Sequence, residues 1–304
     1  MKIGFGFDSF AKEATDGKHQ FLIRLANQFR KNGIIIDNKK PDIFIRLPRE
    51  RICKKAKINV LRVDGLIMNT RWNYKVKNRK IKESIKQSDC LIYQGRFCEM
   101  AYRKFLGIEN KPFAIIPNGA DPLEFSKRKL SNFFIANCKW RPHKRLEPIV
   151  RCFLRALDKG LDADLVVTGK PDYKFKHPRI NYVGWRNRKQ LKKLLARAIA
   201  SIHLTWLDWC PNAMVESIVA RCPVIYTKSG GHHEIAKESG VAVKDTYWNW
   251  GIIDLYDPPK IDYDEVADAM IKLKKEKIEY PINNRLDIDS VANEYLEYFK
   301  KILK

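Results

Sequence analysis

Residues 203–234 have the sequence HLTWLDWCPNAMVESIVARCPVIYTKSGGHHE, and this stretch decides the fold. Residues 202–206 are a short apolar run suited to an interior strand. Pro211 stands where the first residue of a helix tolerates a missing N–H, and apolar residues follow at helical spacing as far as Arg221. Residues 223–226 are predicted to form the next strand, Ser229-Gly230-Gly231 a turn open to a ligand, and 232–238 a helix. The stretch therefore predicts a strand–helix–strand unit.

The start of the predicted helix is a candidate anion site. The free N–H groups of a helix start attract anions, here around Pro211, Asn212 and Ala213. Asp208 lies just before the helix and Glu216 in its second turn, so both carboxylates are expected to line one cleft and to accept hydrogen bonds from hydroxyls. The alternative is an ordinary structural unit with one loop acid and one solvated helix acid.

Short apolar runs and helical patterns alternate along the whole chain. The predicted strands are 2–7, 34–37, 42–47, 59–63, 90–93, 113–116, 133–136, 163–168 and 181–183. The predicted helices are 18–30, 80–87, 97–105, 145–158, 189–198, 263–275 and 288–303. Such alternation is typical of parallel sheets. Gly4 and Gly6 lack the third glycine and the helix start of a dinucleotide fingerprint, which excludes a Rossmann dehydrogenase.

The length of 304 residues, 45% of them hydrophobic, predicts two domains with a cleft between them. The boundary is expected in the polar segment 123–130. The predicted domains are 1–127, completed by the C-terminal helix 288–304, and 128–287. The longest apolar runs are too short to span a membrane and the N-terminal residues do not resemble a secretory signal, so a cytoplasmic protein is expected.

The net charge of +24 is unevenly distributed. Residues 1–128 hold 28 Lys+Arg against 13 Asp+Glu, and the excess is densest at 49–57 and 71–86. Such a surface attracts polyanions, although a generally Lys-rich surface explains the charge equally well. The seven cysteines form no C-x-x-C pair and fall mostly in apolar runs, so we expect reduced packing residues and no structural metal. The histidines show no metal-binding spacing, and His203 is expected to be a hydrogen-bonded core residue.

The pattern of Asp208, seven residues and Glu216, followed by CPVI and GG..E, resembles the E-x7-E signature region of family 4 glycosyltransferases. The resemblance implies that Asp208 contacts the hydroxyls of the donor sugar and that Glu216 binds the ribose. It also implies that amides around Pro211, Asn212 and Ala213 hold the donor phosphate. Asp208 departs from the usual Glu and shortens the reach by one methylene, and Arg221 stands where a small glycine is common.

Further motifs extend the resemblance over nearly the whole chain. IPNGAD at 116–121 is similar to the segment that closes the family's first domain, although Asn118-Gly119 alone predicts only a turn. RVDGL at 62–66 and LIYQ at 91–94 resemble elements of one branch, which implies that Asp64 contacts the acceptor. In NCKWRPHKR at 137–145, Lys144 matches a lysine that neutralises the donor diphosphate, and the matching arginine is either Arg141 or Lys139; a solvated basic loop is the alternative.

Two weaker positions complete the expected donor site. Gly17 matches a family glycine that faces the donor phosphate, and Trp185 follows a strand where the family holds the nucleotide base. For Trp185, a place in the core is the favoured interpretation.

The resemblance implies the two-domain GT-B architecture, with two Rossmann-like parallel sheets facing an interdomain cleft and the last helix crossing back to the first domain. It implies a retaining, metal-independent, hexosyltransferase-like enzyme that needs no cofactor and uses a nucleotide sugar, such as a UDP- or GDP-sugar, as co-substrate. The expected acceptor is a glycan, a lipid-linked glycan or another anionic acceptor. Peripheral association with an anionic membrane is a further expectation, and nucleic acid ranks lower as a partner. The alternatives are a nucleotide-sugar 2-epimerase of the same fold and a non-catalytic protein that binds polyanions or nucleic acid.

Overall fold

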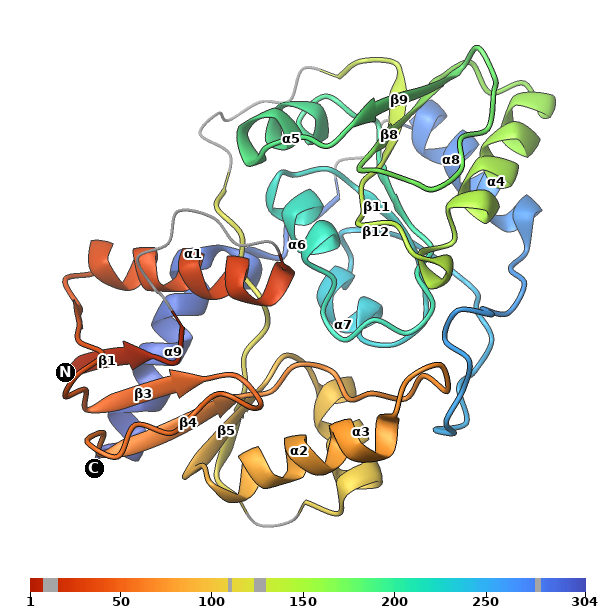
Figure 1. The fold of residues 1–304 in the computed structure, drawn as a ribbon. Helices are drawn as coiled ribbons and strands as arrows, with labels where there is room; N and C mark the ends of the chain where they lie inside the picture. The colour runs from red at the N-terminus through yellow and green to blue at the C-terminus, as the bar shows by residue number, and fades with distance from the viewer. Residues whose placement is uncertain (8–15, 109–110, 123–129, 277–279) are drawn as a thin grey trace. The chain divides into compact units, whose positions relative to one another are not determined.

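The computed structural model describes residues 1–7, 16–108, 111–122, 130–276 and 280–304, and the chain forms two compact units (Figure 1). The first unit comprises Met1–Asp121 and Arg285–Lys304, and the second comprises Pro122–Asn284. The predicted boundary at 127/128 lies outside the described residues. Each unit is an α/β domain built on a parallel sheet, as the alternating pattern predicts.

Six strands form the sheet of the first unit within the described residues. In spatial order they are β2 (Ile35–Ile36), β1 (Lys2–Phe5), β3 (Ile43–Arg46), β4 (Ile58–Arg62), β5 (Cys90–Tyr93) and β6 (Phe113–Ile115). All neighbouring pairs are parallel. The helices of this unit are α1 (Gly17–Lys31), α2 (Tyr74–Lys86), α3 (Arg96–Leu106) and α9 (Ile288–Ile302).

Helix α9 completes the core of the first unit although it follows the whole second unit in the sequence. Figure 1 shows α9 beside α1 against the first sheet. Val291, Tyr295 and Phe299 of α9 are buried in the same cluster as Phe29 of α1. At the start of α9, the N–H of Ile288 donates to the carbonyl of Ala120 at 2.9 Å, and the N–H of Ala120 donates to the carbonyl of Leu286 at 2.9 Å. These bonds join the two passages of the chain that lead to the second unit.

The second unit also holds a sheet of six parallel strands in the part of the chain that is described. In spatial order they are β12 (Gly240–Val243), β11 (Val224–Thr227), β10 (Ser201–His203), β7 (Phe133–Ala136), β8 (Asp164–Thr168) and β9 (Ile180–Gly184). Its helices are α4 (Leu146–Asp158), α5 (Arg188–Leu195), α6 (Asn212–Val219), α7 (His232–Ala236) and α8 (Tyr263–Glu276). Helices α4 and α8 pack together on one face and share the main cluster of buried apolar residues with that face. Apolar residues of α5 pack against the other face.

Four local features differ from the sequence prediction. Strand β12 was not predicted. Helix α2 begins at Tyr74 rather than at residue 80, because the side chain of Asn73 accepts a hydrogen bond from the N–H of Val76 and caps it. Helix α6 begins at Asn212, so Pro211 is its N-cap and not its first helical residue. Asn118 and Gly119 form no turn; the extended segment continues to the bridge between Ala120 and Asp287.

No helix in the described part of the chain is both long enough and apolar enough to cross a membrane.

Candidate active site

The strand order of the second sheet reverses between β7 and β10. From β7 the chain continues outward to β8 and β9, whereas from β10 it continues in the opposite direction to β11 and β12. In open parallel sheets, ligands bind at the carboxyl ends of the strands where the order reverses. The segments that leave these two ends are 137–145 and 204–211, so the two stretches singled out from the sequence meet at the expected place.

At this edge Lys144 and Asp208 form an ion pair, with Nζ 2.5 Å from Oδ2. The side chains are 14% and 21% exposed, so the pair is largely shielded from solvent and still reachable. The N–H of Trp206 also donates to the carbonyl of His143 at 2.9 Å, which joins the two segments through their backbones. The sequence predicts that both residues contribute to one site, and in the structure they contact each other directly.

Arg145 fixes the position of Lys144. Residues Pro142–Lys144 form a single turn of 3-10 helix, and Arg145 ends it in the left-handed conformation with φ of 56°. Its buried guanidinium forms a two-pronged ion pair with Asp245 at 2.7 and 3.0 Å and donates to the carbonyls of Leu204 and Pro259. Left-handed backbone is strained for a residue with a side chain, and these contacts compensate for the strain.

The glycine turn after β11 fixes the position of Asp208. The N–H of Gly231 donates to the carbonyl of Asp208 at 2.8 Å, and Ser229 Oγ accepts from the N–H of Leu207 at 2.9 Å. A Cβ added to Gly230 would lie 2.4 Å from the carbonyl oxygen of Asp208, and one added to Gly231 would lie 2.2 Å from that of Trp209. The bare backbone predicted to approach a ligand therefore approaches the segment that carries Asp208.

The electrostatics of the pair keep both groups charged. Burial acts to raise the pKa of Asp208, but the charge of Lys144 and the hydrogen bond that it donates lower it to about 2. Burial acts to lower the pKa of Lys144, yet the nearby Asp208 raises it above its ordinary value. Each partner thus stabilises the charged form of the other, and the ion pair persists across the neutral pH range.

Three buried histidines lie within electrostatic reach of this pair. Burial lowers the pKa of His143 and of His203 to about 3, and that of His232 to about 4, so all three are neutral at pH 7. His203 is the hydrogen-bonded core residue predicted: its Nε2 lies 2.9 Å from Ser201 Oγ and 3.3 Å from Ser217 Oγ. Among the described residues, no hydrogen-bond partner meets His143 Nδ1 or either ring nitrogen of His232.

Buried polar atoms without partners are costly unless a ligand satisfies them. The indole Nε1 of Trp206 and the amide Nδ2 of Asn137 are also unpaired within the described residues, and both belong to the two segments that form the site. Donors and acceptors of this kind suit a polar ligand with many hydroxyls or phosphate oxygens. No three His, Cys, Asp or Glu side chains in the described ranges are grouped as metal ligands would be.

The start of α6 and its acid lie next to Asp208 in the sequence. No side chain caps this helix start, where Pro211 precedes Asn212 and Ala213. Its N–H groups therefore keep the partial positive charge that attracts an anion. Glu216 lies one turn further along α6 and is half-buried, in the position predicted for it.

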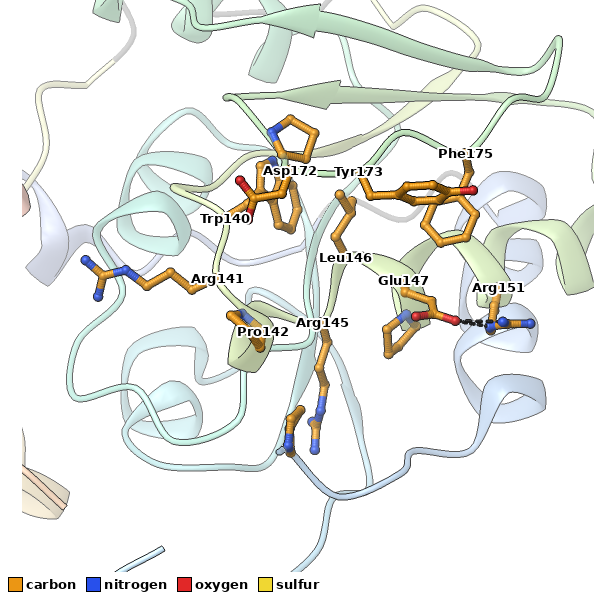
Figure 2. Close-up of a pocket in the computed structure, with 13 residues that line it drawn as sticks. Trp140, Arg141, Pro142, Arg145, Leu146, Glu147, Arg151, Asp172, Tyr173 and Phe175 are labelled. Carbon is orange, nitrogen blue, oxygen red and sulfur yellow. Dashed lines mark hydrogen bonds and ion pairs between the residues drawn. The ribbon is translucent and has the colours of Figure 1, made fainter. Parts of the chain in front are cut away.

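The remaining donor-site candidates occupy different surroundings. Lys139 and Arg141 are exposed on the segment after β7, and Arg141 lines a cavity beside it (Figure 2). Trp185 is 62% exposed, so the favoured prediction of a core residue is wrong; it follows Gly184 at the end of β9, and α5 begins three residues later. Gly17 is exposed at the start of α1 in the first unit, where the side chain of Asp16 caps the helix.

Asp64 belongs to a separate polar network in the first unit. Its Oδ1 accepts from Arg62 Nη1 at 2.6 Å and from Gln94 Nε2 at 2.8 Å. Arg62 is fully buried and also donates to the side chain of Asn118, while Tyr102 donates to the carbonyl of Asp64. The motifs RVDGL, LIYQ and IPNGAD therefore meet at the carboxyl ends of β4, β5 and β6. Asp64 Oδ2 has no partner in the described structure.

Sequence reasoning missed Arg145, His143 and His232. Arg145 ends the basic segment 137–145, where nothing in the sequence distinguishes it from the other cations, but its long-range partner Asp245 makes it a buried structural residue. His143 stacks on Tyr256, with ring centroids 5.6 Å apart and planes 1° apart. His232 has no signal in the sequence beyond its place directly after the two glycines.

The comparison with protein families gives a match to the second unit. Residues 131–275 match the family model described as Glycosyl transferases group 1. The match contains Lys144, Asp208 and Glu216 and ends inside α8. The second unit is therefore similar to the glycosyltransferase domains that this model describes. Among curated proteins, no sequence matches the chain.

Solved structures share the fold of the whole chain at low sequence identity. The sucrose-phosphate synthase of Thermosynechococcus elongatus has a TM-score of 0.71 at 12% identity, covering 99% of this chain and 98% of its own. The HepE protein of Anabaena, solved with UDP and glucose, has a TM-score of 0.69 at 14% identity, covering 99% and 100%. The pneumococcal O-GlcNAc transferase GtfA, solved with UDP and GlcNAc, has a TM-score of 0.63 at 12% identity, covering 97% and 62%. The predicted GT-B fold class is confirmed.

Proposed function

We propose that the protein is a retaining glycosyltransferase of the family 4 type that transfers a sugar from a nucleoside diphosphate sugar to an acceptor hydroxyl. The observation that carries the proposal is the pair of Lys144 and Asp208 beside the start of α6, inside the region that matches group 1 glycosyltransferases. A cation, an uncapped helix start and an acid at one sheet edge supply the groups that a nucleotide sugar needs.

In this proposal Lys144 binds the leaving diphosphate together with the amides at the start of α6. Negative charge accumulates on the phosphate as the bond to the sugar breaks, and a fixed ammonium and a helix dipole stabilise that charge without any metal ion. Arg141 and Lys139 are exposed on the same segment, and either of them supplies the second cation that binds the diphosphate. The neutral imidazoles of His143 and His232 supply further hydrogen bonds.

Asp208 and Glu216 bind the two parts of the donor that carry hydroxyl groups, the transferred sugar and the ribose. Asp208 accepts hydrogen bonds from the sugar, and Glu216 accepts them from the ribose. The exposed face of Trp185 is available to stack on the nucleotide base. The Anabaena HepE structures are titled as complexes with UDP-glucose and with UDP and glucose, which supports UDP-glucose as the first donor to test.

The first unit is proposed to bind the acceptor. Asp64 Oδ2 is a buried carboxylate oxygen without a partner in the described structure, and an acceptor hydroxyl would satisfy it. The basic excess of residues 1–128 favours an anionic acceptor, such as a lipid-linked glycan, or peripheral binding of a cytoplasmic enzyme to an anionic membrane. Nucleic acid remains the lower-ranked partner for the same charge.

The proposed reaction proceeds on one face of the sugar. The bond between the anomeric carbon and the phosphate oxygen breaks, and the acceptor oxygen bonds to the same face of that carbon. The acceptor proton passes to the departing phosphate oxygen, so no covalent sugar–enzyme intermediate is required. The ammonium of Lys144 stabilises the negative charge that develops on the departing phosphate, and Asp208 orients the sugar.

A panel of nucleotide sugars tests the proposal. UDP-glucose, UDP-GlcNAc, UDP-galactose and GDP-mannose are added to the purified protein, and the rise in Tm and the slow hydrolysis of each donor are measured. We expect one donor to raise the Tm and to be hydrolysed, and Lys144→Ala and Glu216→Ala to abolish both effects. Lys275→Ala, which removes an exposed lysine at the end of α8, is the matched control and keeps both.

The outcome also separates the alternatives. Recovery of a 2-epimerised nucleotide sugar would assign an epimerase. Failure of every donor to raise the Tm would assign a non-catalytic binding protein and contradict the proposal, as would full activity of Lys144→Ala. Binding to anionic vesicles and to DNA, each measured across a salt series, ranks the partners of the basic first unit.

A further inference from the structure

A cavity of about 660 Å³ lies in the second unit, between the first turns of α4 and the segment that follows β8 (Figure 2). Its apolar lining includes Trp140, Leu146, Tyr173 and Phe175. Lys144, Asp208 and Glu216 do not line it, so it is separate from the pair that carries the proposed transfer. Its volume falls within the range of about 300–1,000 Å³ that is typical of small-ligand pockets.

The aromatic wall is exposed and at the same time held in place. Tyr173 is 67% exposed, and its ring meets that of Phe175 edge to face, with centroids 4.9 Å apart and planes at 89°. The indole of Trp140 donates from Nε1 to the carbonyl of Thr168 at 2.7 Å, which fixes its orientation. Rigid aromatic rings that face an open cavity are the usual platforms for a ligand with an apolar face.

The charges around the cavity balance. Arg145 is neutralised by Asp245, and Arg151 pairs with Glu147 at 2.6 and 2.8 Å. The side chains of Asp172 and Arg141 carry opposite charges, and neither side chain makes a hydrogen bond or ion pair within the described residues. Figure 2 shows Arg141 extending away from the side where Tyr173 and Phe175 lie. The lining as a whole therefore carries no excess of either sign. Beside the aromatic wall the unpaired charge is the carboxylate of Asp172, which disfavours a phosphate and can accept hydrogen bonds from hydroxyl groups.

We propose that this cavity binds a pyranose ring of a neutral glycan. The C–H face of such a ring packs on Tyr173 and Trp140, and its hydroxyl groups donate to the carboxylates of Asp172 and Glu147 at the rim. A sugar ring presents one apolar face and a neutral polar edge, which is the combination that the walls and the charges require. The inference rests on the proposed function and deepens it, because it adds a contact for neutral sugar residues of a glycan, in the second unit, to the acceptor contact proposed for the first unit.

Binding of oligosaccharides without any nucleotide sugar tests the inference. The probes are maltotetraose, cellotetraose, mannotetraose and chitotetraose, measured by saturation-transfer NMR and by calorimetry. We expect at least one to bind, and Tyr173→Ala to weaken that binding at least tenfold. Tyr247→Ala is the matched control, because Tyr247 is 80% exposed in the same unit and does not line the cavity. Tyr173 is exposed, so its removal leaves the fold intact.

The inference is overturned if none of the four probes binds, or if Tyr173→Ala binds as the unchanged protein does. Displacement of a bound probe by pyrophosphate would likewise overturn it, because it would assign the cavity to an anion. Measurements on Lys144→Ala separate this inference from the proposed function. Lys144 does not line the cavity, so oligosaccharide binding persists in that variant while stabilisation by the nucleotide sugar is lost.

Discussion

Each unit places an aspartate beside a cation at the carboxyl end of its sheet, but the two pairs are built differently. In the first unit Arg62 is fully buried, and its guanidinium donates hydrogen bonds to the side chains of Asp64 and Asn118. In the second unit Lys144 is partly exposed, and its ammonium pairs with Asp208. The planar guanidinium of arginine serves several acceptors at once, whereas a lysine ammonium rotates freely on a flexible chain.

The difference separates a permanent contact from an exchangeable one. Arg62 cannot leave its partners without leaving a buried charge unpaired. In the proposed function Lys144 transfers its bond from Asp208 to an incoming phosphate, because both side chains reach solvent and the phosphate replaces the lost charge. We therefore expect substitutions in the first pair to change stability and substitutions in the second to change function.

The largest effect is expected for Arg62→Ala. The substitution leaves the buried side chains of the first unit without their central donor and costs about 3–5 kcal/mol of unfolding free energy. Urea unfolding followed by hydrogen exchange in β4 and β5 measures it. Arg51→Ala, at an exposed position of the same unit, should stay within about 0.5 kcal/mol. Equal stability of the two variants would show that Arg62 is not the centre of the network.

Lys144→Ala should lower the rate of transfer about 10²–10³-fold, because the departing diphosphate loses its main charge partner. Its cost in stability should be smaller than that of Arg62→Ala, because Lys144 is 14% exposed and pairs with one carboxylate, whereas the fully buried Arg62 donates to two side chains. The kcat for the donor identified in the panel and the urea midpoint of the same preparation measure both effects. A variant that loses stability but retains its kcat would reverse the assigned roles of the two pairs.

The two units should also respond differently to acid. The ordinary histidine pKa of 6.5 is lowered to about 4 in His232 and to about 3 in His143 and His203, mainly because the rings are buried. Below pH 6.5 these histidines therefore bind protons in the unfolded chain and stay unprotonated in the folded second unit. Stability present above pH 6.5 is lost as the pH falls toward 4, by up to about 1.4 kcal/mol per pH unit for each histidine.

Tryptophan fluorescence measures this loss in the second unit, which holds six of the seven tryptophans, whereas the first unit contains one of the six histidines. Urea midpoints at pH 7.5, 6 and 5 should fall for the fluorescence signal. His232→Gln should flatten the slope. A midpoint that does not change between pH 7.5 and 5 would contradict the buried neutral state of these rings.

The smallest effect is expected for Asp208→Glu. The added methylene moves the carboxylate into the space where Lys144 Nζ lies 2.5 Å from Oδ2, so the pair and the bound sugar must shift. We expect kcat/KM for the preferred donor to fall about tenfold, or about 1.4 kcal/mol, and the ranking of donors to change. Competition between two nucleotide sugars in one reaction measures the ranking. An unchanged ranking would remove Asp208 from the recognition of the sugar.

The sequence was sufficient to predict the two parallel sheets, because interior strands are short apolar runs and the helices between them show a clear period. Strand β12 was not predicted because its sequence, GVAV, begins with Gly240, a residue that weakens a strand pattern and here packs against the backbone of Val224. The first residues of α2, before residue 80, were not predicted because they carry lysines and an arginine, and because the start of the helix depends on the cap at Asn73.

The site was predictable in its parts and not in its contacts. Asp208 and the start of α6 are adjacent in the sequence, so one short pattern contains both. Lys144 lies 64 residues away from Asp208, and no local period connects them. Trp185 was misjudged because an aromatic residue after a strand is usually buried, and here the chain leaves the sheet at Gly184 with φ of 72°. Long-range contacts of this kind follow from topology rather than from composition.

The late position of α9 determines the order in which the protein matures on the ribosome. Domains usually fold during synthesis in the order in which they emerge. Here Pro122–Asn284 emerges as one continuous segment and contains its whole core, whereas the sheet made first lacks Val291, Tyr295 and Phe299 until residues 285–304 have been synthesised. The unit translated first is therefore completed last, and the nascent chain carries an open apolar surface until then.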